Sequence, residues 1–140
     1  MRLFETFRTR KEELPRLTMC VRNFADNAGL KSDIALGLEL AADEAASNII
    51  DHAYNEGGNG EINMVCSVQN GEIQLEMYDS GKPFNPTTAI KSAMIKSIND
   101  KDKGGFGLLL MRHFTDNIRY RYTPDGKNHL TLAVRLDNVA

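Results

Sequence analysis

Apolar and polar residues alternate with two different periods along this chain, and these periods predict most of its elements. Residues 3–9 alternate between large and polar side chains and predict a short first strand. From Lys11 to Ala28 the apolar residues recur at helical spacing, and Pro15 falls in the first turn, where a helix tolerates proline. Gly29 then predicts the end of that first helix.

A second helix is predicted to run to about Tyr54, with Ser32 or Asp33 as its N-terminal cap. Most of its circumference is apolar, so we expect it to be packed between layers. The core-facing stripe is Ile34, Leu38, Ala41, Ala45 and Ile49, and a second patch is Leu36, Ala46 and Ile50. Glu44 and Asn48 lie one turn apart at the edge of the stripe. A buried carboxylate is costly without a partner, so the two residues either satisfy one another, cap a neighbouring loop, or belong to a functional site.

Two hairpins are predicted by alternating strands that flank turn sequences. The first hairpin joins residues 61–68 to the next strand through an Asn-Gly turn, which is a strong hairpin signal. Asp79 continues the inward phase of that next strand, so a carboxylate ends an otherwise apolar row. The second hairpin joins residues 118–122 to residues 130–136 through a Pro-Asp-Gly turn.

Glycines and lysines interrupt the pattern between the two hairpins. Gly81 begins a loop that can be neither strand nor helix. Residues 87–103 show weak helical periodicity and several lysines, which also fits a solvated surface helix and loop. Residues 104–107 then open directly onto an apolar helix.

This order of elements predicts an α+β fold. We expect a two-layer sandwich in which helices cover one face of a mixed, mainly antiparallel sheet. A doubly wound parallel fold is excluded because two hairpins require antiparallel pairing. Residues 1–140 are expected to form a single domain, because 140 residues suit one domain and no repeat or linker divides them.

Composition and charge narrow the classes of function. The hydrophobic fraction of 41% and the charged fraction of 26% are ordinary for a soluble globular protein. The net charge is −2 with the two signs interspersed, so no basic face points to a nucleic-acid partner. Cys20 and Cys66 are isolated, as expected for reduced thiols. No apolar run is long enough to span a bilayer, so we expect a cytoplasmic protein without a membrane partner.

Glycines before a helix suggest an anion site. They leave backbone N–H groups free to face an anion, and the helix N-terminus favours phosphate. Gly104, Gly105 and Gly107 therefore predict a phosphate site, although such glycines also serve as plain turns. The motif is neither a Walker A loop nor a Rossmann fingerprint, because no GK[ST] follows it and no strand precedes it.

Three polar residues supply the remaining chemistry of a nucleotide site. Asp79 could accept a hydrogen bond from an exocyclic amine such as that of adenine, and Gly81 would let the base approach the backbone. Asn48 offers the kind of amide oxygen that Mg²⁺ takes alongside phosphate oxygens. Glu44 is placed to accept a proton from an attacking hydroxyl or water.

The histidines do not suggest metal or hydrolase chemistry. His52, His113 and His129 show no zinc spacing, and no GxSxG motif occurs. His52 is expected to pack or hydrogen-bond beside the nucleotide site.

Three motifs together resemble the GHKL ATPases, the superfamily that joins gyrase, heat-shock protein 90, histidine kinases and MutL. E-A-A-S-N-I-I-D-H-A-Y at residues 44–54 looks like the N box, D-S-G-K-P-F at 79–84 like the first glycine box, and K-G-G-F-G-L at 103–108 like the second. Their order and spacing most closely resemble the anti-sigma factor serine/threonine kinases of bacterial partner switching. The resemblance spans nearly the whole chain and implies the GHKL, or Bergerat, ATP-binding fold.

The resemblance implies a role for each matching residue. Glu44 would be the general base, Asn48 the Mg²⁺ ligand and Asp79 the residue that recognises adenine. The other residues expected to contact ATP are His52, Gly81, Phe84, Lys103, Gly104, Gly105, Phe106, Gly107, Leu108 and Thr131. In the family a threonine of the last strand commonly supports the adenine-binding aspartate, and Thr131 is expected to do so here. Pro83 replaces the second glycine of the superfamily pattern DxGxG, a form that is common among the anti-sigma kinases.

The function implied by the resemblance is that of a Mg-ATP-dependent serine/threonine protein kinase and anti-sigma factor. It would phosphorylate a STAS-type anti-sigma antagonist and sequester a sigma factor or an equivalent client, and the resemblance also allows a homodimer. Two alternatives stay open. One is an ATP-binding partner-switch module without kinase activity. The other is a detached histidine kinase catalytic domain, which is disfavoured because no helix pair with a phosphoacceptor histidine is predicted.

Overall fold

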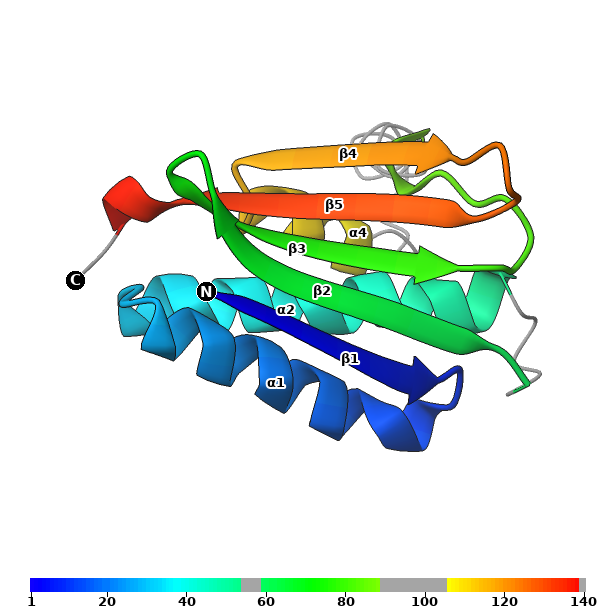
Figure 1. The fold of residues 1–140 in the computed structure, drawn as a ribbon, viewed down its shortest axis with the longest axis horizontal. Helices are drawn as coiled ribbons and strands as arrows, with labels where there is room; N and C mark the ends of the chain where they lie inside the picture. Colours follow the sequence, from blue (N-terminus) through cyan, green and yellow to red (C-terminus); the bar gives the residue numbers. More distant parts are fainter. Residues whose placement is uncertain (54–58, 89–105, 139–140) are drawn as a thin grey trace.

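A five-stranded antiparallel sheet with helices on one face forms the described part of the chain (Figure 1). The computed structural model describes residues 1–53, 59–88 and 106–138. The strands are β1 (Arg2–Arg8), β2 (Glu61–Gln69), β3 (Glu72–Asp79), β4 (Asn117–Tyr122) and β5 (Asn128–Arg135), in the spatial order β1-β2-β3-β5-β4. The helices are α1 (Leu14–Asn27), α2 (Ser32–Asn48) and α4 (Phe106–His113), with shorter helical turns η1 (Lys11–Glu13), η2 (Ile49–Ala53) and η4 (Leu136–Asn138).

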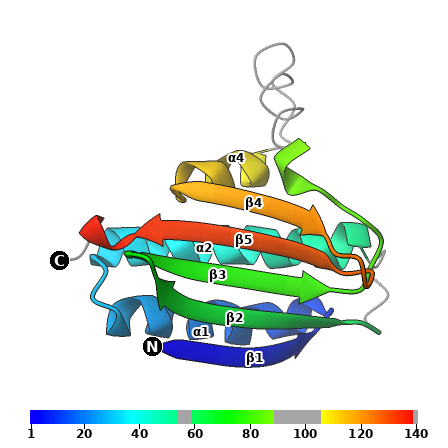
Figure 2. The ribbon, with the colours of Figure 1, turned by 45° about the horizontal axis from the view of Figure 1, so that its top comes forward.

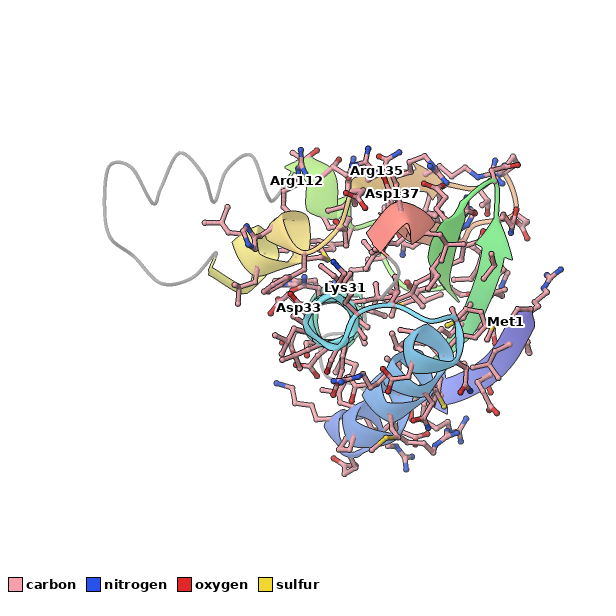
Figure 3. The ribbon with its side chains drawn as sticks, turned by 90° about the vertical axis from the view of Figure 1, so that its left-hand side faces the viewer. Met1, Lys31, Asp33, Arg112, Arg135 and Asp137 are labelled. Atoms are coloured by element: carbon pink, nitrogen blue, oxygen red, sulfur yellow. The ribbon has the colours of Figure 1, made fainter. Side chains whose placement is uncertain are left out.

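The predicted α+β sandwich is confirmed, with one refinement. Figure 3 looks along the strands from the end where Met1 and Arg135 lie, and it shows α1, α2 and α4 gathered on one side of the sheet. Each of the pairings described, from β1·β2 to β4·β5, is antiparallel. The mixed component of the predicted sheet is therefore not found among the described strands. In Figure 2, β1 forms one edge of the sheet and β4 the other.

The core lies between the helices and the inward rows of the three central strands. These rows alternate as predicted, because every second side chain of a strand faces the same side. Their members, each no more than 6% exposed, are Ile62, Met64, Cys66, Ile73, Leu75, Met77, Leu130, Leu132 and Val134. The hairpin between β2 and β3 turns at Asn70 and Gly71 with φ of 52° and 75°, which is the conformation that an Asn-Gly turn favours. The first hairpin prediction is thus confirmed.

The first helix also follows its pattern, but the predicted cap of the second helix is wrong. Gly29 has φ of 88° just after α1, as expected for a helix-ending glycine. Lys31 occupies the N-cap position of α2 without a side-chain hydrogen bond. Ser32 Oγ instead accepts a bond from Arg22 Nη2 at 3.0 Å, and Asp33 Oδ1 accepts from the adjacent Ile34 N–H at 3.0 Å. Both side chains therefore have other partners.

Small residues let α2 lie close to its neighbours. Its alanines are at most 1% exposed, and they are Ala35, Ala41, Ala42, Ala45 and Ala46. A Cβ at Gly37 would lie 2.5 Å from Phe114 Cδ1, so glycine is needed there for close approach. The predicted second patch is wrong in one member. Ala46 and Ile50 are buried, but Leu36 is 45% exposed, because it lies on the side of the helix that faces solvent.

The end of α2 changes its winding. The α-helix stops at Asn48 and continues as the π-helical turn η2 to Ala53, while Tyr54 lies outside the described residues. Most of the predicted helix over residues 87–103 lies outside them as well. Within the described part of the chain, no helix has the length and apolar character needed to cross a membrane.

Candidate functional site

A pocket of about 330 Å³, open solvent included, lies where α2 and β3 end. The C-terminal ends of both elements lie at the same end of the molecule, on the right in Figure 1. The pocket is lined by Ala45, Asn48, Ile49, Asp79, Phe84, Pro86, Tyr120, Asn128 and Leu130. Two predicted site residues, Asn48 and Asp79, therefore meet in one cavity although they are far apart in sequence.

Asp79 is held at the bottom of this pocket by hydrogen bonds to one of its oxygens. It is 3% exposed, and its Oδ1 accepts from Asn128 Nδ2 at 3.0 Å and from Gly81 N at 2.9 Å. Burial raises the pKa of the Asp79 carboxyl, whereas these two donors and the nearby Lys127 ammonium oppose that rise. Both described bonds fall on Oδ1, so Oδ2 keeps its capacity to accept a hydrogen bond from a ligand.

Asn128 is a site residue that was not predicted from the sequence. Its Nδ2 also donates to Gly81 O at 3.3 Å and to Lys82 O at 3.0 Å. Its Oδ1 accepts from Phe84 N at 3.1 Å and from the Tyr120 hydroxyl at 2.5 Å. The signal that could have found it is its phase. Like Asp79, Asn128 is a polar residue at the end of an apolar inward row.

Thr131 does not support Asp79, and this prediction is wrong. In the register of β3 and β5, Asp79 lies opposite Asn128, whereas Thr131 lies opposite Glu76. Positions 128 and 131 are an odd number of residues apart, so they face opposite sides of the sheet. Thr131 Oγ1 instead lies 3.4 Å from His129 Nε2 on the face away from the pocket. Asn128 holds the position that Thr131 was expected to fill.

Glu44 and Gly107 meet at the other side of the site. A Cβ at Gly107, in the first turn of α4, would overlap the Glu44 carboxylate. Glycine at this position therefore lets the carboxylate of α2 lie directly against α4. Burial is the main cause that raises the pKa of Glu44, and the charges of Asp43 and Asp51 add to it. A raised pKa makes this carboxylate a stronger base.

Asn48 carries an unsatisfied group. It is 7% exposed, and its Nδ2 has no hydrogen-bond partner among the described residues. Burying such a group is costly unless a ligand engages it, and a half-turn of the amide would present Oδ1 instead. No cluster of three or more His, Cys, Asp or Glu side chains forms a metal site in the described part of the chain. An amide oxygen at this position is of the kind that Mg²⁺ takes alongside phosphate oxygens and water, so the Asn48 side chain is compatible with that ion.

Some of the remaining predicted site residues have side chains that the structure describes, and the others do not. The rings of His52 and Phe84 stack with centroids 4.6 Å apart and an interplanar angle of 6°, and Phe84 lines the pocket, whereas contact of His52 with a nucleotide stays a prediction. Leu108 is half-buried against the core. Phe106 begins α4, but its side chain is not described. Lys103, Gly104 and Gly105 lie outside the described residues.

Comparisons with known proteins agree with this arrangement. Residues 7–134 match the histidine kinase-like ATPase domain. The serine/threonine-protein kinase BtrW of Bordetella bronchiseptica is 40% identical over 95 residues, which cover 68% of this chain and 66% of that protein. An anti-sigma F factor of Clostridium botulinum is 27% identical over 81 residues, which cover 58% of this chain and 57% of that protein. The chain thus spans less than two thirds of the length of these two relatives.

A solved structure shows a similar fold. The structure of RsbU and RsbW domains from Mycobacterium tuberculosis superposes with a TM-score of 0.67 at 15% identity, and the match covers 96% of this chain and 32% of that one. At this identity the likeness concerns the fold alone.

Proposed function

This chain belongs to the histidine kinase-like ATPase domain family, and from that premise we propose that it binds Mg-ATP and transfers the γ-phosphate to a serine or threonine of a partner protein. The observation that carries the proposal is the Glu44 carboxylate against Gly107, one turn before Asn48 on the same helix. This contact supports the proposal because a carboxylate, an amide and a helix N-terminus lie close together, and Asp79 lines the same pocket as Asn48. The names of similar proteins, a serine/threonine-protein kinase and an anti-sigma F factor, support the proposal.

The adenine base would occupy the pocket between α2 and β3. Its walls are mostly apolar, with Ile49 and Leu130 on opposite elements, which suits the faces of a purine. Asp79 Oδ2 would accept the exocyclic amine, because Oδ1 is already engaged. Gly81, whose N–H donates to Asp79, would let the base approach the backbone there.

The phosphates would extend from there toward the start of α4. Backbone N–H groups of the first turn of a helix are unpaired within it and face an anion favourably. When bound, Mg²⁺ would neutralise phosphate charge, with Asn48 as its protein ligand. Contact of Lys103, Gly104 and Gly105 with the phosphates stays a prediction.

Glu44 would act as the general base. Its side chain lies one turn from Asn48 and contacts the first turn of α4, so it is next to the place proposed for the γ-phosphate. Its raised pKa lets it take the proton of an attacking serine or threonine hydroxyl more readily than a solvent-exposed glutamate would. The proton moves to the Glu44 carboxylate, while the hydroxyl oxygen bonds to phosphorus and ADP leaves.

The partners belong to the same proposal. The phosphoacceptor would be a STAS-type anti-sigma antagonist, and a sigma factor or an equivalent client would be held when the antagonist is phosphorylated. The phosphate adds about −1.5 to −2 charge to the antagonist surface, which would weaken its docking. The chain would then exchange partners according to that charge, as a monomer or as a homodimer.

The kinase proposal is tested by the Glu44→Gln variant. Purified protein would be incubated with labelled ATP, Mg²⁺ and a purified STAS-domain protein, and Mg-ATP affinity would be measured by calorimetry. Loss of a general base is expected to slow transfer by about 10²- to 10⁴-fold, while ATP binding is retained. Glu39→Gln is the matched control, because Glu39 lies on the same helix and pairs with Arg22 away from the pocket. A wild-type protein that binds the STAS protein and ATP but transfers no phosphate would establish the binding module instead.

A further inference from the structure

The Asn128 side chain is the most fully engaged polar group of the pocket. Five hydrogen bonds end on it, and their partners lie in residues 79–84 and at Tyr120. Its two ends have opposite environments. Among the described residues, Nδ2 faces three carbonyl or carboxylate oxygens, which can only accept, whereas Oδ1 accepts from a backbone N–H and a hydroxyl. The amide therefore has one allowed orientation, because the flipped form would place its oxygen against three acceptors.

This fixed orientation determines what Asp79 can do. Asn128 always presents an N–H to Asp79 Oδ1, and Gly81 N–H presents a second donor to the same oxygen. Donors of this kind favour the ionised carboxylate over the neutral acid, whereas burial favours the neutral acid. Without the amide, a carboxyl that is 3% exposed would more readily hold a proton and could then donate a hydrogen bond.

We propose that Asn128 is the positioning residue that sets base specificity: it holds Asp79 as an acceptor toward the pocket and thereby selects a purine with an exocyclic amine over a 6-oxopurine. The inference rests on the proposed ATP site and adds the residue that enforces its selectivity. A 6-oxopurine presents a carbonyl oxygen where adenine presents an amine. That oxygen would face the carboxylate without a donor between them, which a buried site rejects strongly.

The same residue also shapes the wall of the pocket. Nδ2 donates to Gly81 O and Lys82 O, and Oδ1 accepts from Phe84 N. Three hydrogen bonds therefore join the loop after β3 to β5. Tyr120, from β4, fixes the Oδ1 end. Asn128 thus sets the orientation of the Asp79 carboxylate and the position of the loop beside it together.

The test measures, by calorimetry in the presence of Mg²⁺, the affinities of wild type and Asn128→Leu for ATP and for ITP. The base of ITP is a 6-oxopurine. Wild type is expected to prefer ATP by about 10- to 100-fold, the effect of one hydrogen bond to a charged group. Asn128→Leu should bind ATP at least about 10-fold more weakly and should narrow the preference to about threefold or less. Thr131→Val is the matched control on the same strand, because Thr131 is buried on the other face of the sheet, and both affinities should stay at wild-type values.

Thermal melting would show whether Asn128→Leu folds, and a second variant tests the proposal if it does not. Asn128→Asp keeps the side-chain shape and the Oδ1 contacts, but it places a carboxyl 3.0 Å from Asp79 Oδ1. Two carboxyls this close share one proton. At pH 5.5 that proton replaces the amide donor, so the variant should prefer ATP to ITP. By pH 9 the proton is lost, so the variant should lose ATP affinity. The other titratable groups described as acting with Asp79 are Lys127 and Tyr120, and wild type measured at both pH values corrects for them.

The outcomes separate this inference from the function on which it rests. A wild type that binds neither nucleotide, or binds ITP as tightly as ATP, overturns the adenine site itself and this inference with it. A selective wild type together with a folded Asn128→Leu that is equally selective overturns only the role of Asn128. Equal ATP affinity of Asn128→Asp at pH 5.5 and pH 9 would also overturn it.

Discussion

The contact between Gly107 and Glu44 makes a sharp prediction for the Gly107→Ala variant. The added methyl would lie 2.9 Å from Glu44 Oε2 and closer still to Oε1 and the carboxyl carbon. Non-bonded heavy atoms pack at about 3.5–4.0 Å, so the carboxylate must move by roughly 1 Å or more. Because a misplacement of that size can cost about 10²-fold in rate, phosphate transfer by Gly107→Ala is expected to fall about 100-fold.

The 100-fold loss of activity corresponds to about 2.7 kcal/mol, and the loss of stability should be no larger than that. Alanine gains about 0.5–1 kcal/mol over glycine within a helix, while crowding in a packed site costs about 1–3 kcal/mol. The two effects oppose each other, so the net loss should be about 2.5 kcal/mol or less. Chemical denaturation measures this change, and transfer of labelled phosphate to the STAS protein measures activity.

A control and a double variant make the reasoning refutable. Gly37→Ala brings the same change into α2 against the Phe114 ring, 2.5 Å from the added methyl and away from the pocket, so it should lower stability without lowering the transfer rate of folded protein. If Gly107→Ala acts through Glu44, adding it to Glu44→Gln should cost almost no further activity. Wild-type transfer by Gly107→Ala, or a full additional loss in the double variant, would refute the proposed coupling.

Two further predictions concern the carboxylates. Asp79→Asn should weaken ATP binding by about 10- to 100-fold, because an acceptor to the exocyclic amine loses its charge, and an unchanged calorimetric affinity would remove Asp79 from the adenine site. The raised pKa of Glu44 also has a sign that stability can test: a raised carboxyl pKa stabilises the fold below the ordinary glutamate value of 4.5, and this stability is lost as pH rises through the folded-state pKa. Glu44→Gln should therefore gain stability relative to wild type at pH 7 and gain less at pH 4, as measured by urea denaturation, and a larger gain at pH 4 would contradict the burial argument.

The alternating strands and the ends of the hairpins could be predicted from the sequence. A period of two leaves little choice of face once several apolar residues are in phase, and this is why the phase of Asp79 alone was enough to predict its inward position. The same parity argument applied to β5 would have chosen Asn128 and rejected Thr131, but the family pattern directed attention to a threonine. A family resemblance indicates which type of residue to expect, whereas the register of β3 and β5 determines which residue can contact Asp79.

The contacts between helices could not be predicted in the same way. Nothing in the local pattern indicates that Glu44 lies against Gly107, because that contact depends on how α4 packs on α2. The predicted cap of α2 was wrong for a related reason, because Arg22 of the preceding helix donates a hydrogen bond to the Ser32 hydroxyl. Local preference is weak where a tertiary partner competes for the same group.

The position of β5 determines at what stage of synthesis the pocket can form. β5 is the last strand along the described chain, yet it lies between β3 and β4, and it brings Asn128 to Asp79 across a separation of 49 residues. During synthesis, β1, β2 and β3 can leave the ribosome and pair with one another while the pocket still lacks the wall that Asn128 and Leu130 of β5 supply. A nascent chain therefore completes this pocket only when nearly all of its described residues have emerged, so under the proposed function incomplete chains would not compete with finished protein for ATP.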